Sequence, residues 1–161
     1  MTRIDRRHFL ATAALASAAV GGGALAQGTD TPNVALVKSL YAAFGKGDTA
    51  TIVAAVTADV DWEAVGRASD FPTLGPRKGP AAVQDFFGLV GNTMTFSEFA
   101  PKEFYAVGDK VFVLGRYAMT IKKTGKAMAS DWVHIFTIAD GKVRVFREFL
   151  DTARAAEANR S

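Results

Sequence analysis

Apolar residues recur at helical spacing near the start of the folded part of the chain. From residue 33 onward they fall three or four positions apart, which places them on one face of an α-helix. These positions are Val34, Val37, Tyr41 and Phe44. Glycines at 45 and 47 end the pattern, and Asp48 is a suitable N-cap for a second, short helix over residues 49–56.

The pattern then changes to alternation, which predicts strands. Residues 60–65 alternate polar and apolar, with Trp62 and Ala64 on one face. Residues 66–79 are rich in glycine and proline and predict a loop, after which Pro80 suits the first turn of a third helix. Four strands joined by hairpin turns follow over residues 96–107, 111–121, 130–138 and 143–150, with a kink or bulge expected near Pro101.

The last hairpin contains the most promising chemistry, because it brings His134 near Glu148. Alternation places His134 on the same face as Trp132 and Phe136. A three-residue turn at 139–141 pairs residue 138 with residue 142, and it puts Glu148 on that face, beside Trp132. A two-residue turn at 140–141 would instead turn Glu148 away and bring Arg147 in, so the site depends on one residue of register.

The N-terminus resembles an export signal. Arg6 and Arg7 precede Phe9 and an alanine-rich apolar stretch, which is the twin-arginine pattern, and Ala24–Ala26 offers a small-x-small cleavage site. We therefore expect a signal peptide over 1–26, a polar leader over 27–32, one domain over 33–156 and a tail over 157–161. A periplasmic or secreted protein that meets the twin-arginine machinery only transiently is expected; an N-terminal membrane anchor is the alternative.

Composition excludes several functional classes. Removing the signal takes away three arginines and one aspartate and lowers the formal net charge from +3 to +1. No basic patch that would bind nucleic acid is left. The chain has no cysteine, so disulfides and thiolate chemistry are excluded. One histidine in the mature chain gives no metal signature, and we expect neither a metal nor another cofactor.

Several segments together resemble a known family. They read L-Y-A-A-F-G-K-G-D, V-D-W-E-A-V-G, G-P-R-K-G-P-A-A-V-Q-D-F-F, D-W-V-H-I-F and D-G-K-V-R-V-F-R-E-F-L-D-T. In these segments the chain resembles the SnoaL-like and ketosteroid-isomerase-like branch of the nuclear transport factor 2-like superfamily. The resemblance implies an α+β fold in which a cone-shaped, curved, mixed or antiparallel sheet wraps around three helices and encloses a pocket.

The resemblance separates two reactions. Ketosteroid isomerases place a tyrosine on the first helix, a carboxylate base on the first strand and an acid on a late strand. Those positions fall on Leu40, Ala64 and His134 in this chain, which argues against the steroid isomerase mechanism. Tyr41, one residue away, is interpreted as a core residue of the helix.

SnoaL-like polyketide cyclases are the better match, since they line the pocket with a histidine and an acid on successive late strands. The resemblance therefore implies that His134 and Glu148 are catalytic, with the carboxylate moving a proton. The predicted substrate-binding walls are aromatic: Trp62, Phe86, Tyr117, Trp132 and Phe146. Asp151 is interpreted as the N-cap of a short tail helix rather than as a catalytic group.

Two functions stay open. One is an acid/base isomerase or cyclase that acts on a small apolar carbonyl compound, and the alternative is a non-catalytic module that binds a small molecule in the same pocket. An epoxide hydrolase would need Arg147 and Asp151 to turn inward. The convex sheet face is expected to form a homodimer through apolar residues, namely Val133, Ile135, Val143, Val145 and Phe149, with Phe112 and Leu114 beside them.

Overall fold

A computed structural model describes residues 31–160 of the chain. The expected signal peptide and residues 27–30 of the expected polar leader lie outside the described residues and stay predictions, whereas the last two leader residues belong to the start of the first helix. The elements are α1 (Pro32–Gly45), α2 (Thr49–Ala54), β1 (Val56–Ala64), β2 (Gly75–Lys78), α3 (Gly79–Thr93), β3 (Met94–Val107), β4 (Lys110–Ile121), β5 (Ala127–Ala139), β6 (Lys142–Leu150) and α4 (Thr152–Asn159).

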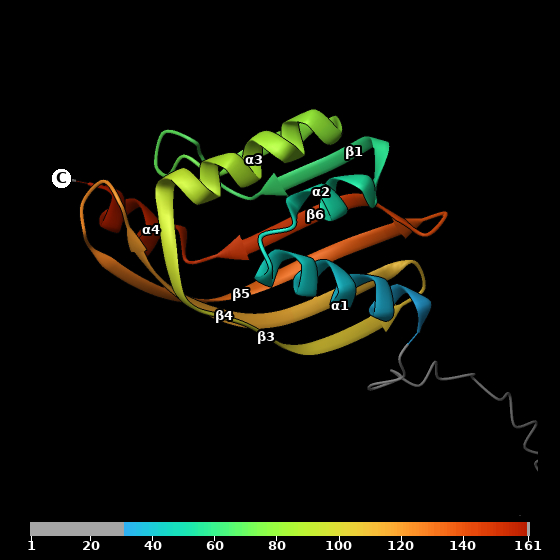
Figure 1. Cartoon of the computed structure of the whole chain (residues 1–161). Coiled ribbons are helices and arrows are strands. Elements are labelled where there is room, and N and C mark those ends of the chain that lie inside the picture. The colour runs from blue at the N-terminus through green and yellow to red at the C-terminus, as the bar shows by residue number, and fades with distance from the viewer. Residues whose placement is uncertain (1–30, 161) are drawn as a thin grey trace, which may run out of the picture.

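One sheet contains all six strands, in the order β2-β1-β6-β5-β4-β3. Neighbouring strands are antiparallel except β1 and β6, which run parallel. The sheet curves, and α1, α2 and α3 cover its concave face (Figure 1). The predicted α+β class and the curved mixed sheet around three helices are confirmed; the predicted loop over 66–79 contains the short edge strand β2.

Short polar side chains fix where three of the helices begin. Thr31 accepts a hydrogen bond from the backbone N–H of Val34 at 3.2 Å and starts α1, with proline in the first turn. Asp48 and Asp151 accept equivalent bonds from Thr51 and Arg154, each at 3.0 Å. The predicted capping roles of the two aspartates are confirmed, and they satisfy backbone donors that a helix start leaves unpaired.

The curvature of the sheet has a local cause in β3. Its register against β4 shifts twice, between Phe96 and Glu98 and between Pro101 and Glu103. Extra residues of this kind bend and twist a strand, and proline cannot donate to the ladder at the second shift. The irregularity expected near Pro101 is thus present, and it helps the sheet to wrap around the helices.

The hairpin between β5 and β6 differs from the expected one in two ways. Its turn has two residues, Asp140 and Gly141, with φ of 50° and 73°, the pair of positive values that suits a tight hairpin. The predicted three-residue turn is therefore wrong. A β-bulge follows, because the partners run Ile138↔Val143 and then Thr137↔Val145, which leaves Arg144 unpaired.

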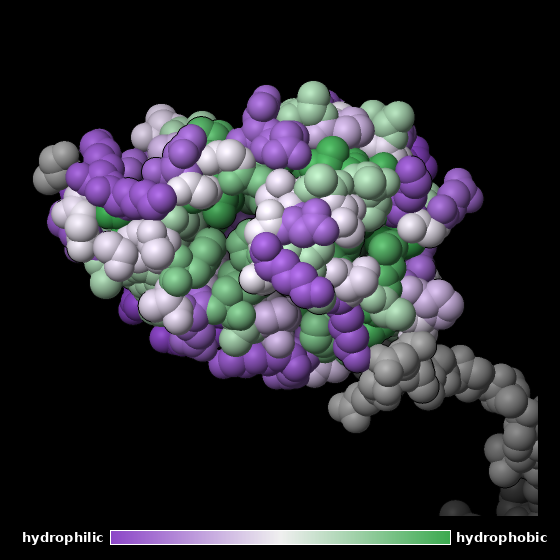
Figure 2. Space-filling view, in the orientation of Figure 1, coloured by the Kyte–Doolittle hydropathy of each residue, from purple (hydrophilic) through white to green (hydrophobic). Residues whose placement is uncertain are grey.

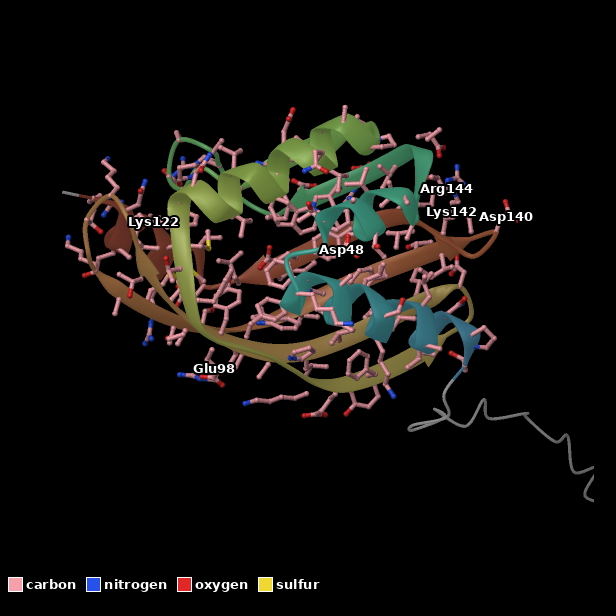
Figure 3. The ribbon with its side chains drawn as sticks, viewed as in Figure 1. Asp48, Glu98, Lys122, Asp140, Lys142 and Arg144 are labelled. Atoms are coloured by element: carbon pink, nitrogen blue, oxygen red, sulfur yellow. The ribbon has the colours of Figure 1, made fainter. Side chains whose placement is uncertain are left out.

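This bulge reverses the consequence of the short turn. The extra residue at Arg144 lies close to the hairpin tip in Figure 3. It puts the rest of β6 back in the orientation in which Glu148 faces the concave side, which a two-residue turn alone would have reversed. Glu148 therefore points inward and pairs directly with His134, not with Trp132 as expected. The two-residue turn itself pairs Val143 with the inward-facing Ile138 before the bulge. Val143 is therefore fully buried in the core, and its predicted place on the convex face is wrong.

Candidate functional site

An apolar cavity of about 90 Å³ lies between the concave sheet face and the three helices. This space is well above the roughly 10–15 Å³ that one water needs, and it suits a small ligand. Apolar residues gather around a hollow between α1 and the end of the molecule that holds α4 (Figure 2). Among the described residues that line the cavity, Glu148 provides the one carboxylate and His134 the one imidazole.

Glu148 and His134 face each other across β5 and β6 inside this cavity. Their side chains are 13% and 7% exposed, and the Nε2 atom of His134 lies 3.5 Å from Oε1 of Glu148. That distance is long for a hydrogen bond, and Nε2 has no other partner among residues 31–160. The contact is therefore a loose one, which a small movement or a bound ligand can tighten.

Tyr41 completes the histidine's surroundings from helix α1. Its hydroxyl lies 2.8 Å from Nδ1 of His134. Burial, and then the charge of Glu148, raise the pKa of Tyr41, so the phenol stays protonated and can donate. If Tyr41 donates to Nδ1, the proton of neutral His134 resides on Nε2 and faces the carboxylate of Glu148. Sequence reasoning took Tyr41 for a core residue and missed this contact.

Tyr117, on strand β4, contacts the same oxygen of Glu148 that faces His134. Its hydroxyl donates to Oε1 of Glu148 at 3.4 Å. Burial is the main cause that raises the pKa of Tyr117, followed by the charge of Glu148. Both polar contacts of Glu148 within the described chain thus involve Oε1, and neither involves Oε2.

Trp132 supports the histidine rather than lining the cavity. Its indole stacks on the imidazole of His134 at 3.9 Å and 22°. The ring lies flat over Gly115, its register partner on β4, where a Cβ would overlap the indole. Only glycine, which has no Cβ, leaves space for the indole at this position. Gly115 therefore determines where the ring of Trp132 lies, and the stacked ring of Trp132 determines the plane of the imidazole of His134. Trp132 was predicted to lie in the cavity wall, but in the structure it is not among the residues that line the cavity.

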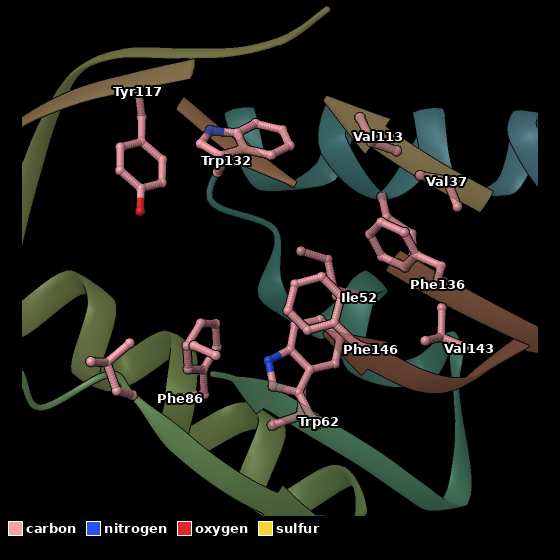
Figure 4. Close-up of a cluster of buried hydrophobic side chains, with 14 of the residues drawn as sticks. Val37, Ile52, Trp62, Phe86, Val113, Tyr117, Trp132, Phe136, Val143 and Phe146 are labelled. Atoms are coloured by element: carbon pink, nitrogen blue, oxygen red, sulfur yellow. The ribbon is translucent and has the colours of Figure 1, made fainter. Parts of the chain in front are cut away.

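The other predicted wall residues do line the cavity. Trp62 stacks on Phe146 at 3.9 Å and contacts Phe86 at 5.8 Å between ring centres. Figure 4 has Trp62, Phe86 and Phe146 on one side of the cluster and the hydroxyl of Tyr117 pointing inward from the other. Alternation along β1, β4 and β6 turns Trp62, Tyr117 and Phe146 inward, and Phe86 meets them from the buried side of α3. Their roles in binding stay predictions.

The convex side of the same strands has a different chemistry. Arg147 lies 3.0 Å from Asp61 and 3.4 Å from Glu63. The guanidinium, by donating to Asp61, is the main cause that lowers the pKa of that carboxyl group. Arg147 therefore does not enter the cavity, and Asp151 caps α4, so the Asp-Arg-Asp arrangement of an epoxide hydrolase is not assembled from them.

Within residues 31–160, no three His, Cys, Asp or Glu side chains are grouped so that they could hold a metal ion. The described helices also include none that is long and apolar enough to span a membrane.

The family follows from a comparison of the sequence with family models. The model of the SnoaL-like domain matches residues 37–146, which is well over half of the chain. The chain belongs to the SnoaL-like domain family. A search for similar curated proteins finds no match.

Several solved structures have a similar fold. An NTF2-like protein from Burkholderia xenovorans is 30% identical with a TM-score of 0.74, covering 84% of this chain and 99% of that chain. TerC, co-crystallised with polyporic acid, is 28% identical with a TM-score of 0.70, covering 80% of this chain and 98% of its own. An LEH-like epoxide hydrolase of M. tuberculosis is 18% identical with a TM-score of 0.62, covering 79% and 88%, and shows the fold alone.

Proposed function

We propose that this SnoaL-like protein is an acid/base catalyst that removes a proton next to the carbonyl group of a small apolar compound. One observation carries the proposal. A mostly buried carboxylate, that of Glu148, lines an apolar cavity, and within residues 31–160 one of its oxygens contacts neighbouring side chains while the other has no partner. A positioned carboxylate in a dry cavity is a suitable general base.

Each polar residue then has a role. Oε2 of Glu148 takes the proton, and the electrons of the broken C–H bond form the C=C bond of an enolate. Return of the proton at another carbon gives isomerisation, whereas attack of the enolate carbon on a second carbonyl gives cyclisation. His134 and Tyr117 hold Oε1, and Tyr41 keeps the proton of His134 on the nitrogen that faces Glu148.

The experiment measures deuterium exchange and so requires no knowledge of the natural substrate. The purified protein is incubated with 1-indanone in D2O, and loss of the signal of the protons beside the carbonyl is followed by NMR. Catalysed exchange is expected, and Glu148→Gln should reduce it by about a hundredfold or more, the range that one general base supplies. Glu63→Gln, a carboxylate on the convex side, is the matched control and should exchange at the wild-type rate.

A non-catalytic binding module is the competing function. The strongly apolar lining of the cavity favours tight binding of a flat ligand in either case. If the wild-type protein binds 1-indanone and related enones and lactones but exchanges no proton above the buffer rate, the catalyst is ruled out and the binding module is supported.

We also propose that the protein forms a homodimer through its convex sheet face. Leu114, Val133 and Phe149 form one row across β4, β5 and β6. Leu114 and Phe149 are 38% and 45% exposed, and a row of large apolar residues in water favours a partner surface. Sedimentation equilibrium should give a dimer at tens of micromolar, an order-of-magnitude choice for specific interfaces, and Phe149→Asp should give a monomer. A monomeric wild type would contradict this assembly.

The proposed location is the periplasm or the medium, with cleavage near Ala26. The paired arginines at 6 and 7 are the feature that supports export by the twin-arginine route. Replacing both with lysine should leave the precursor uncleaved in the cytoplasm, as judged by mass spectrometry of fractionated cells. Unchanged processing of that variant would contradict this route.

A further inference from the structure

The indole N–H of Trp62 is a buried donor that has no partner in the described part of the chain. Trp62 is 3% exposed, and its Nε1 has no hydrogen bond within residues 31–160. Buried polar groups are almost always paired, because losing water without a replacement acceptor costs free energy. A buried donor left open therefore requires an explanation, and a ligand acceptor supplies one.

The position of this donor points to the cavity. Trp62 lines the cavity, and in Figure 4 its nitrogen lies on the edge of the ring that faces Phe86 and the open centre of the cluster. The second indole differs: Trp132 also has an unpaired Nε1, but this residue does not line the cavity and its ring lies over Gly115. Of the two indole donors in the described part of the chain, Trp62 is therefore the one placed to meet a molecule bound in the cavity.

The register puts the donor within reach of the proposed base. Trp62 on β1 pairs with Phe146 on β6, and Glu148 lies two residues further along β6 on the same face. Two residues along a strand span about 6–7 Å. A small planar molecule can therefore place an oxygen atom against Trp62 and a neighbouring C–H bond against Glu148 at the same time.

We propose that Trp62 Nε1–H donates a hydrogen bond to the carbonyl oxygen of the ligand and so selects small, flat, apolar ketones and enones. In the reaction, Glu148 receives the proton, the C–H electrons move into the new C=C bond, and the charge that develops on oxygen is met by the indole N–H. A donor placed where charge develops stabilises the transition state. The proposed role of Trp62 in catalysis rests on the proposed function, whereas its proposed role in recognising the carbonyl group does not.

The test compares two ligands that differ by one oxygen, 1-indanone and indane. Wild-type protein should bind 1-indanone about tenfold more tightly than indane, the ratio expected for one hydrogen bond to a buried donor. Trp62→Phe keeps an aromatic wall and removes the N–H, so it should abolish that preference while indane affinity changes by less than threefold. Isothermal titration calorimetry measures both affinities.

NMR provides a readout that needs no folded variant. The chain has two tryptophans, and their indole N–H signals can be assigned with Trp62→Phe and Trp132→Phe, or by through-space contacts if either variant does not fold. Addition of 1-indanone, but not of indane, should move the Trp62 signal downfield and leave the Trp132 signal in place.

The outcomes separate the two proposals. No preference for 1-indanone over indane, including no binding of either, or a stationary Trp62 signal, overturns the role of Trp62. A moving Trp62 signal together with the absence of deuterium exchange keeps carbonyl recognition and removes catalysis by Glu148. Exchange that persists at the wild-type rate in Trp62→Phe keeps Glu148 and limits Trp62 to binding.

Discussion

The two faces of strand β6 place charge in opposite settings. On the concave face, Glu148 is 13% exposed and meets an imidazole and a phenol. On the convex face, the adjacent Arg147 is 26% exposed and meets two carboxylates at 3.0 and 3.4 Å. The carboxylates on the convex face are held in ion pairs with one guanidinium, whereas Glu148 makes both of its polar contacts within the described residues through Oε1 alone. The concave face therefore presents a carboxylate to the cavity, whereas the convex face uses its charges in ion pairs that join β6 to β1.

The largest expected effect is on the packing behind His134. Gly115→Ala would place a methyl group inside the indole of Trp132, and overpacking of this kind costs about 3 kcal/mol. We expect the free energy of unfolding, measured in urea, to fall by about that amount. The displaced indole should also release the imidazole of His134, so deuterium exchange should fall together with stability.

Gly88→Ala is the matched control for this prediction. Gly88 lies within α3, and a Cβ there would meet nothing within 4 Å. It should stabilise the protein by up to about 1 kcal/mol, because alanine favours helix. In a Trp132→Leu background the cost of Gly115→Ala should shrink. An equal cost in both backgrounds would show that the indole is not the obstacle.

The sequence predicted the face of each strand better than it predicted the contacts between elements. Alternation correctly placed His134 inward, since a strand has a period of two residues. The inward position of Glu148 was correct for the wrong reason, because it depends on a bulge at Arg144 that offsets a two-residue turn. The Asp-Gly pair at 140–141 predicts that short turn, but no local sequence pattern predicts the bulge.

Contacts between distant elements were missed for a related reason. The bond between Tyr41 and His134 joins residues 93 positions apart, and its existence depends on how α1 packs across the sheet. Helical spacing placed Tyr41 on the inner face but could not say what its hydroxyl meets. The need for glycine at 115 likewise depends on a ring from the next strand, which becomes visible only when the register between β4 and β5 is known.

A smaller effect is expected from removing the hydroxyl that holds His134. Tyr41→Phe leaves Nδ1 of His134 buried without its partner, and an unpaired buried group costs about 2 kcal/mol. Exchange activity should fall and its pH dependence should change, because the tautomer of His134 is no longer set. Tyr105→Phe removes an exposed hydroxyl bonded to Glu103 and should change neither quantity. A pH profile identical to that of the wild type would mean that Tyr41 only fills space.

The smallest expected effect is on the convex face. Arg147→Met removes the ion pairs to Asp61 and Glu63, whose side chains are about a quarter exposed. Because water screens such pairs, we expect the free energy of unfolding to fall by only about 1 kcal/mol near pH 7. Arg144→Met is the control, since its pair with Asp59 is 3.7 Å apart and exposed, and it should cause no measurable change. Neither substitution should alter the exchange rate.

The pH dependence of this loss has a definite sign. Because Arg147 lowers the pKa of Asp61 in the folded protein, the contribution of Asp61 is fully present above its unfolded pKa of about 3.9. It disappears as the pH falls through the lowered folded value. Urea unfolding should therefore separate wild type from Arg147→Met at pH 7 and bring them closer in strong acid. A difference that is constant with pH would mean that the aliphatic part of Arg147, and not its charge, stabilises the junction of β1 and β6.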